Sequence, residues 1–593
     1  MTINTITWDL DPIFAGGSES PALAEFLAEL TADMAAFERI GWPDLSGEAA
    51  EAQWRESIQT LFKLTMRLRQ AGAFANCLVS QDVKDNRALQ LTAQIDQKNG
   101  QLSTFWTKFS AAAARQPDTA WQQLLNTGPL AEISFHLNEE RELARQKMAP
   151  ELETLVDELA ASGYHAWDRL YGLVSGDKEV KWQGQPTSLY QLQITFSDDP
   201  DRTVRQQAFD LFGAAWTDLA KICAEALNQQ AGFRLTLYKH RGWDSVLHEP
   251  LLENRLRRDS LEAMWAVIEV KSAKLLDYFA AKAKLFGIDQ LSWFDVHAPV
   301  GKVSSSLSWD GATGFVEGNL RSFNPDLADF ARMALDRRWV EAENRPGKRA
   351  GGYCTSFPLS KETRIFMTFN GSYNSMLTLA HELGHSYHAW VMRDLPYGAQ
   401  YCTAGVAETA STLNEMVVRE ASYRDADDDQ TRLSLLGTKL SDAAAFLMDI
   451  RARYEFELAF FEQRATKHLS VDELSDLMLT AQKKAFKEGL VRYHPLFWAS
   501  KLHFYMTRAP FYNFPYTFGF LFSNGVYAQA LAEGPSFRER YVALLRDAGS
   551  MNTEDLARTH LGVELTQPEF WETAVDRVLA DVDEFVVLVD KLS

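Results

Sequence analysis

The pentapeptide His381-Glu382-Leu383-Gly384-His385 constrains this chain more than any other stretch, because its two histidines meet if the segment is a helix. Residues four apart lie on one face of a helix. Both imidazoles can then reach one metal ion, with Glu382 beside them as a base. A catalytic zinc site takes three protein ligands and leaves a fourth position for water. The plainer alternative is a pair of surface histidines on a polar helix face.

The flanking sequence predicts a β-hairpin and then a helix. Residues 353–369 predict the hairpin, with a turn near 360–362, because the second half is apolar and rich in β-branched and aromatic side chains. Asn370-Gly371 interrupts this pattern. From about 376 to 392 the apolar residues recur at the spacing of an amphipathic helix. The pentapeptide therefore lies on a helix that directly follows a small sheet.

A second helix, predicted from about residue 405 to 421, supplies a third ligand. Glu408 and Glu415 lie seven residues apart and share one face of it. A loop and a returning helix would bring Glu408 to the histidines, giving a His-His-Glu set for one zinc ion. Glu415 would fix the tautomer of a ligating histidine. Spacing alone leaves open that both glutamates lie on a solvated face. His388 is expected to donate to the ligands or to line the pocket, since a residue at i+7 rarely reaches the same ion.

These segments resemble the oligoendopeptidase F branch of the thimet oligopeptidase-like zinc metallopeptidases. The match runs from about residue 180 to the end and is weaker before it. Its matching segments are His-Glu-Leu-Gly-His-Ser-Tyr-His at 381–388, Ala-Glu-Thr-Ala-Ser-Thr-Leu-Asn-Glu at 407–415, a glycine-rich segment at 344–354 and an aromatic segment at 510–516.

The resemblance implies a role for each candidate residue. The two histidines and Glu408 bind zinc, and Glu382 is the general base that assists the attack of a zinc-bound water. A histidine and tyrosines near the C-terminus stabilise the transition state. Their candidates here are His503 and Tyr512, and then Tyr505 and Tyr516. From the residues alone, this phenylalanine-rich region favours an aromatic core over a catalytic role.

A peptide substrate also has to be held in an extended form. The edge of the strand at 363–369 can do so through backbone hydrogen bonds, by adding the peptide as a further strand. Gly351 and Gly352 would let the backbone approach the substrate closely. Packing or turn formation explains these glycines equally well.

Helical periodicity covers most of the chain and predicts a mainly α protein with a small β-sheet beside the metal-binding helix. Residues 293–320 and 508–525 are predicted as non-helical. We expect two domains, an N-terminal helical domain at 1–195 and a catalytic zinc metallopeptidase domain at 196–593. The resemblance adds that the fold is of the zincin type, with a deep substrate channel between two helical halves.

Composition limits the class of protein. The net charge is −20 and no long basic run occurs, which argues against nucleic acid or an anionic membrane as a partner. The N-terminus has no secretory signal, and no apolar stretch is long enough to span a bilayer. Four scattered cysteines indicate reduced thiols. We therefore expect a cytoplasmic protein; its oligomeric state is left open by the sequence.

The function predicted from these features is a zinc-dependent endopeptidase that hydrolyses short peptides. One alternative is a zinc carboxypeptidase of related helical fold, for which no Arg or Lys stands out as a partner of the free C-terminus. The other is a non-catalytic peptide-binding scaffold with structural zinc, against which Glu382 counts, because a structural site needs no base.

Overall fold

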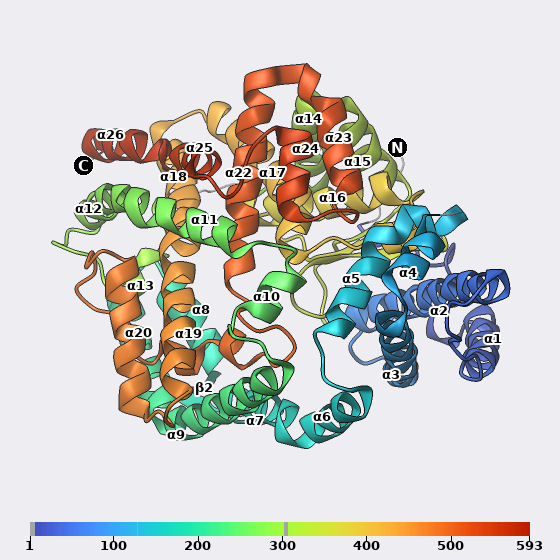
Figure 1. Cartoon of the computed structure of the whole chain (residues 1–593). Helices are drawn as coiled ribbons and strands as arrows, with labels where there is room; N and C mark the ends of the chain where they lie inside the picture. The colour runs from blue at the N-terminus through green and yellow to red at the C-terminus, as the bar shows by residue number, and fades with distance from the viewer. Residues whose placement is uncertain (1–5, 127, 302–305, 593) are drawn as a thin grey trace. The chain divides into compact units, whose positions relative to one another are not determined.

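The computed structural model describes residues 6–126, 128–301 and 306–592. Helices make up most of this part of the chain, and its strands form two small sheets (Figure 1). The mainly α class predicted from the periodicity is therefore confirmed. None of the described helices is both long and apolar enough to cross a membrane.

The chain divides into two compact units, each built from three segments. Unit 1 is Met1–Lys147, Ser305–Ala421 and Ala530–His560, and unit 2 is Met148–Ser304, Ser422–Gln529 and Leu561–Ser593. The predicted domains, 1–195 and 196–593, are continuous in sequence. That division stays a prediction, as does the channel between two halves.

Unit 1 contains the sheet and the helices around it. Its elements are α1 (Pro21–Phe37), α2 (Glu48–Gln81), α3 (Asn86–Arg115), α4 (Asp118–Leu125), α5 (Ser134–Arg145), α14 (Trp309–Phe323), α15 (Pro325–Asp336), β3 (Val340–Glu341), β4 (Tyr353–Phe357), β5 (Glu362–Phe366), α16 (Tyr373–Met392), most of α17 (Ala404–Arg424), α23 (Phe537–Asp547) and α24 (Thr553–Leu561).

Unit 2 is helical apart from one hairpin. Its elements are α6 (Pro150–Gly163), α7 (His165–Gly176), β1 (Glu179–Trp182), β2 (Gln185–Ser188), α8 (Leu189–Asp198), α9 (Arg202–Arg241), α10 (His248–Glu253), α11 (Arg258–Lys271), α12 (Leu275–Leu285), α13 (Trp293–Val296), α18 (Asp429–Ala444), α19 (Ile450–Arg464), α20 (Val471–Ala485), α21 (Phe497–Ser500), most of α22 (Phe514–Glu533), α25 (Pro568–Leu579) and α26 (Asp581–Leu592).

The core of unit 1 joins the N-terminal helices to the sheet. Helices α2 and α3 pack side by side as a helical hairpin (Figure 1), and Asp85 caps α3 by accepting a hydrogen bond from the Ala88 N–H. Buried aromatic side chains of these helices form one apolar cluster with Phe357 of β4 and Phe366 of β5. Burial of that cluster fixes the sheet against α2.

The three-stranded sheet has the order β3-β5-β4, so β5 is its central strand. β5 pairs parallel with β3 and antiparallel with β4, where Tyr353 lies opposite Phe366. The strand predicted to offer its edge to a peptide therefore has a neighbour on each side, and β3 and β4 are the edge strands. The prediction was wrong because β3 has two residues, too few for an alternating pattern to reveal a strand.

Two stretches predicted as non-helical contain helices. In the first, α13 lies within 293–320, and α14 begins there and extends past residue 320. Ser308 caps α14 by accepting a hydrogen bond from the Gly311 N–H. The glycines of α14 suggested a loop, but its buried face of Val316 and Leu320 stabilises the helix. In the second, α22 begins at Phe514, because phenylalanines spaced four residues apart bury one face.

Candidate metal centre and active site

Helix α16 places the two histidines of the pentapeptide on one face, as predicted. Ser372 caps the helix by accepting a hydrogen bond from the Ser375 N–H at 3.2 Å. Leu379 and Leu383 are fully buried on the opposite side. The helix packs against β4, β5 and α23. The sheet and α23 therefore hold the helix that carries the histidines.

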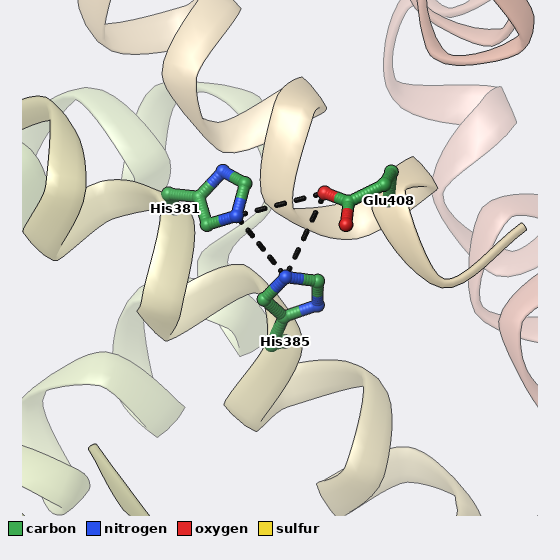
Figure 2. A group of neighbouring side chains, drawn as sticks. All are labelled: His381, His385 and Glu408. Atoms are coloured by element: carbon green, nitrogen blue, oxygen red, sulfur yellow. Dashed lines mark hydrogen bonds and ion pairs between the residues drawn. The ribbon is translucent and has the colours of Figure 1, made fainter. Parts of the chain in front are cut away.

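The side chains of His381, His385 and Glu408 converge on one point (Figure 2). The Nε2 atoms of the histidines are 3.1 Å apart, and Glu408 Oε2 lies 3.5 Å from His381 Nε2 and 3.7 Å from His385 Nε2. In a tetrahedral zinc site with bonds of about 2.0–2.2 Å, ligand atoms lie about 3.3–3.6 Å apart. The donor set and its spacing therefore fit a metal of this kind.

Glu415 holds His381 in the orientation that a ligand needs. The Nδ1–H of His381 donates to Glu415 Oε1 at 2.6 Å, so the neutral ring keeps its Nε2 lone pair for the cluster. Arg419 donates to the other carboxylate oxygen of Glu415 at 3.1 Å. Burial lowers the pKa of His381, but the hydrogen bond of Glu415 and the charges of Glu415, Glu408 and Glu382 outweigh it and raise the pKa to about 9, so metal binding at Nε2 displaces a proton there and leaves the ring neutral. Glu415 lies where the sequence placed it.

The other histidine of the helix, His388, lies outside the cluster. Its Nε2–H donates to the backbone carbonyl of Leu545 on α23 at 3.0 Å, and the ring is buried. It therefore helps to fix α16 against α23. The pKa of His385 falls to about 3, first because of burial and then because of the neighbouring His381 and His388, so His385 stays neutral and able to bind a metal.

The glycine inside the pentapeptide lets α16 and α17 cross closely. A Cβ at Gly384 would lie 2.4 Å from the Ala410 carbonyl oxygen and 2.6 Å from Ser411 Cα. Backbone cannot yield to such contacts without moving the helix. Gly384 therefore sets the distance between the helix of the histidines and the helix of Glu408.

Gly384→Ala is expected to push the two helices apart. We expect the free energy of unfolding to fall by about 1–3 kcal/mol, as for other overpacked cores, and the affinity for zinc to fall with it. Thermal unfolding and competition with a chelator measure the two effects. Gly314→Ala on α14 is the matched control, because no atom lies within 4 Å of its Cβ. Equal melting temperatures and zinc affinities for both variants would contradict this account.

Glu382 is buried beside the ligand set and has a vacant acceptor. Its side chain is 6% exposed, and Oε2 has no hydrogen-bond partner within the described ranges. Burial raises its pKa to about 7. A Cβ at Gly352 would lie 3.4 Å from Glu382 Oε1, so Gly352 leaves the carboxylate space on that side. Gly351 has a φ of +96°, so the turn before β4 explains why a glycine stands at this position.

The predicted residues near the C-terminus form an aromatic group in unit 2. The ring of His503 lies 5.1 Å from that of Tyr512 and 6.0 Å from that of Tyr516. Tyr505 differs from its predicted role in contacting a substrate, because it is fully buried, stacks on Tyr171 and donates to the Trp498 carbonyl. The role of the other three toward the metal centre stays a prediction.

Asn513, which the sequence analysis missed, fixes the tautomer of His503. The Arg453 guanidinium, which can only donate, donates to Asn513 Oδ1 at 3.1 Å and so sets the orientation of the amide. The same oxygen faces His503 Nδ1 at 2.8 Å, so that ring nitrogen must carry the proton. Burial lowers the pKa of His503 to about 4. The neutral ring therefore offers an acceptor at Nε2, not the donor that an oxyanion needs.

The sequence matches two family models. The model described as peptidase family M3 matches residues 198–577, and the model described as oligopeptidase F matches residues 114–179. The chain belongs to peptidase family M3. The resemblance to the oligoendopeptidase F branch is thereby confirmed, and membership implies a catalytic metal, for which the His-His-Glu cluster is the fitting site in the described residues.

Relatives of this M3 peptidase are similar over part of their length. Oligopeptidase PepF of Bacillus subtilis is 26% identical over 67% of this chain and 60% of its own length. Group B oligopeptidase PepB of Streptococcus agalactiae is 25% identical over 64% of this chain and 63% of its own. The aligned part is thus about three fifths of each relative.

Solved structures share the fold over nearly the whole chain. A putative peptidase from Chlamydophila abortus superposes with a TM-score of 0.84 at 18% identity, covering 99% of this chain and 98% of that one. Oligoendopeptidase F from Enterococcus faecium gives a TM-score of 0.69 at 18% identity, covering 96% and 98%. At this identity the likeness shows the fold alone, and it agrees with the predicted large helical class.

Proposed function

We propose that this M3 peptidase is a zinc-dependent endopeptidase that hydrolyses short peptides. The observation that carries the proposal is the convergence of His381, His385 and Glu408 beside the buried, unpartnered Oε2 of Glu382. A structural zinc site is closed by a fourth protein ligand and needs no base. The arrangement therefore favours catalysis over a peptide-binding scaffold. The names of the relatives support peptides as substrates.

Each residue at the centre has a defined task in peptide hydrolysis. Zinc held by the two histidines and Glu408 would polarise the substrate carbonyl and lower the pKa of a water molecule. Glu382 takes the proton of the attacking water at Oε2 and passes it to the leaving amine. Burial of Glu382 keeps bulk water from competing for this proton. Glu415 keeps the lone pair of His381 directed at the metal.

The developing oxyanion needs a further hydrogen-bond donor. We assign that task to the Tyr512 hydroxyl, because neutral His503 offers a lone pair at Nε2. One such donor is typically worth about 3–4 kcal/mol of transition-state stabilisation. His503 then acts by accepting a hydrogen bond at Nε2. Asn513 acts by keeping the proton of His503 on Nδ1. Tyr516, whose ring stacks on His503 at 6.0 Å, remains a candidate for contact with the substrate.

Asn513→Leu tests the tautomer directly. Without the amide acceptor, His503 can protonate at either nitrogen, and we expect kcat to fall about tenfold, the cost of about one buried hydrogen bond. Asn513→Asp keeps an acceptor toward His503 and is expected to lose less. Steady-state kinetics, with ¹⁵N chemical shifts of the His503 ring, measure both effects. A folded Asn513→Leu variant with unchanged kcat and an unchanged ring tautomer would refute the assignment.

The peptide is proposed to lie along β4, the edge strand that starts next to Gly352. Backbone groups on the outer side of an edge strand bind an extended peptide as an additional strand. Because a Cβ at Gly352 would approach both Glu382 and the Phe366 carbonyl oxygen, the backbone at the start of β4 lies close to the base. The scissile bond would therefore lie opposite this end of β4.

Cleavage of a peptide blocked at both ends separates this proposal from a carboxypeptidase. We expect the wild type to cut it at an internal bond, as seen by mass spectrometry, and to lose this activity with a chelator. Complete resistance of the blocked peptide, with cleavage of its unblocked form, would favour the carboxypeptidase.

A cytoplasmic location also belongs to the proposal. The buried thiols of Cys77 and Cys223, neither of them in a disulfide, support it.

A further inference from the structure

A cavity of about 550 Å³ lies within unit 1 at the far end of the edge strand β4. Ser356 of β4 and the following Pro358 form one wall. Helices α2, α3 and α5 and the loop between α16 and α17 form the others. Most of its large lining side chains are aromatic: Phe62, Trp106, Tyr397 and Tyr401. No task in the hydrolysis described above uses this cavity.

We propose that the cavity is a subsite for a large apolar side chain, preferably aromatic, four residues away from the bond that is cut. The proposal rests on the proposed function, because it places the peptide along β4. Gly352, next to Glu382, marks the position of the scissile bond. Ser356, which lines the cavity, is four residues further along the strand (356 − 352). A peptide paired residue for residue with β4 brings its fourth residue to this point.

Aromatic rings packed against one another form part of the cavity wall. The ring of Trp106 lies 5.2 Å from that of Phe62, and His136 lies 5.8 Å from each. The Trp106 indole N–H already donates to Thr65 Oγ1 at 3.2 Å. A Cβ at Gly398 would lie 2.9 Å from the Phe62 ring, so the loop packs directly on α2 and cannot close the cavity further. Ring edges and faces arranged in this way favour an aromatic side chain of the substrate.

The two charged groups of the cavity are held by neighbouring side chains of the chain itself. Arg69 donates to Thr355 Oγ1 of β4 at 3.4 Å. Glu140 accepts a hydrogen bond from Ser110 Oγ at 3.0 Å. A charged side chain of the peptide would meet both signs of charge in one cavity. An apolar side chain packs against the aromatic walls and is not repelled by either charged group of the cavity. It is therefore the occupant that we propose.

Matched peptides test the subsite. They differ in having Phe or Ala at the fourth residue before or after the cut bond, and kcat/KM is compared for each pair. For the wild type we expect a preference for Phe of about tenfold at one of the two positions, the usual size of discrimination by an apolar pocket. The side on which it occurs also gives the direction of the peptide along β4.

Variants connect the preference to the cavity. Tyr401 is 57% exposed, so Tyr401→Ala shortens a wall without opening the core. We expect the preference for Phe to fall below threefold, because kcat/KM for the Phe peptide falls. Trp106→Leu removes a second wall, and its melting curve shows whether it folds. Tyr190→Ala, at a tyrosine that is 71% exposed on α8 of unit 2, is the matched control and should keep the full preference.

Two results would overturn the subsite: no preference for Phe at either position in the wild type, or the full preference in both folded cavity variants. Failure of the proposed function is a different result, in which the wild type cuts no peptide. In that case, labelled Phe and Ala peptides are compared for binding to the Glu382→Gln protein by fluorescence anisotropy. Equal affinities there overturn the subsite, whereas tighter binding of the Phe peptide that is lost with Tyr401→Ala supports it.

Discussion

Glu382→Gln should lower kcat for peptide cleavage by about 10²- to 10⁴-fold, the range that a general base contributes. The amide keeps the size and shape of the side chain but cannot take a proton from water. Because the ligand atoms come from other residues, the variant should keep its zinc and its melting temperature. Cleavage of a quenched peptide, with zinc determined on the same sample, measures this.

A second buried glutamate supplies the control for this variant. Glu554 of α24 is 3% exposed, belongs to the same unit and lies outside the ligand cluster. Glu554→Gln should therefore cleave within about twofold of the wild type, since a change away from the chemistry leaves the transition state untouched. A Glu382→Gln protein that cleaves as fast as this control would show that Glu382 is not the base.

Glu408→Ala should remove tightly held zinc, and with it nearly all activity. The glutamate supplies one of three converging ligand atoms, and two histidines alone leave the ion open to competition by water and chelators. We expect zinc content after dialysis to fall far below one ion per chain, and the loss of affinity to exceed the about 10- to 100-fold typical of a residue that supports a ligand.

Glu415→Gln is the matched comparison, because Glu415 lies seven residues after Glu408 on the same helix and contacts His381 at Nδ1, without being one of the three converging ligands. This variant should lose affinity within that 10- to 100-fold range and keep most of its zinc at saturating concentration. If Glu408→Ala kept its full zinc content after dialysis, the third ligand would have to be another residue.

The metal centre could be predicted from sequence because its parts are local. Two histidines four residues apart specify their own relation on a helix, and the loop before α17 is short enough to bring Glu408 back. The hairpin β4–β5 was also visible from its β-branched and aromatic residues and its turn. The contact between Gly384 and Ala410 was not, because it depends on how two helices cross, which spacing within each helix does not encode.

The remaining differences between the sequence predictions and the structure also come from contacts that spacing within one element does not encode. The edge strand was misassigned because the two-residue β3 has no pattern of its own and pairs with β5 through a contact distant in sequence. Tyr505 and Tyr516 were both expected to contact the substrate, yet Tyr505 stacks on Tyr171 and is fully buried. The orientation of His503 depends on Arg453, 50 residues earlier (503 − 453), through Asn513.

Anomalous diffraction from a crystal of the zinc-loaded wild type tests the central claim most directly. The account predicts one zinc peak at about 2.0–2.2 Å from His381 Nε2, His385 Nε2 and a carboxylate oxygen of Glu408, with a non-protein ligand at the remaining position. Glu415 should stay on His381 Nδ1. A peak at another place in the chain, or a fourth protein ligand closing the site, would contradict it.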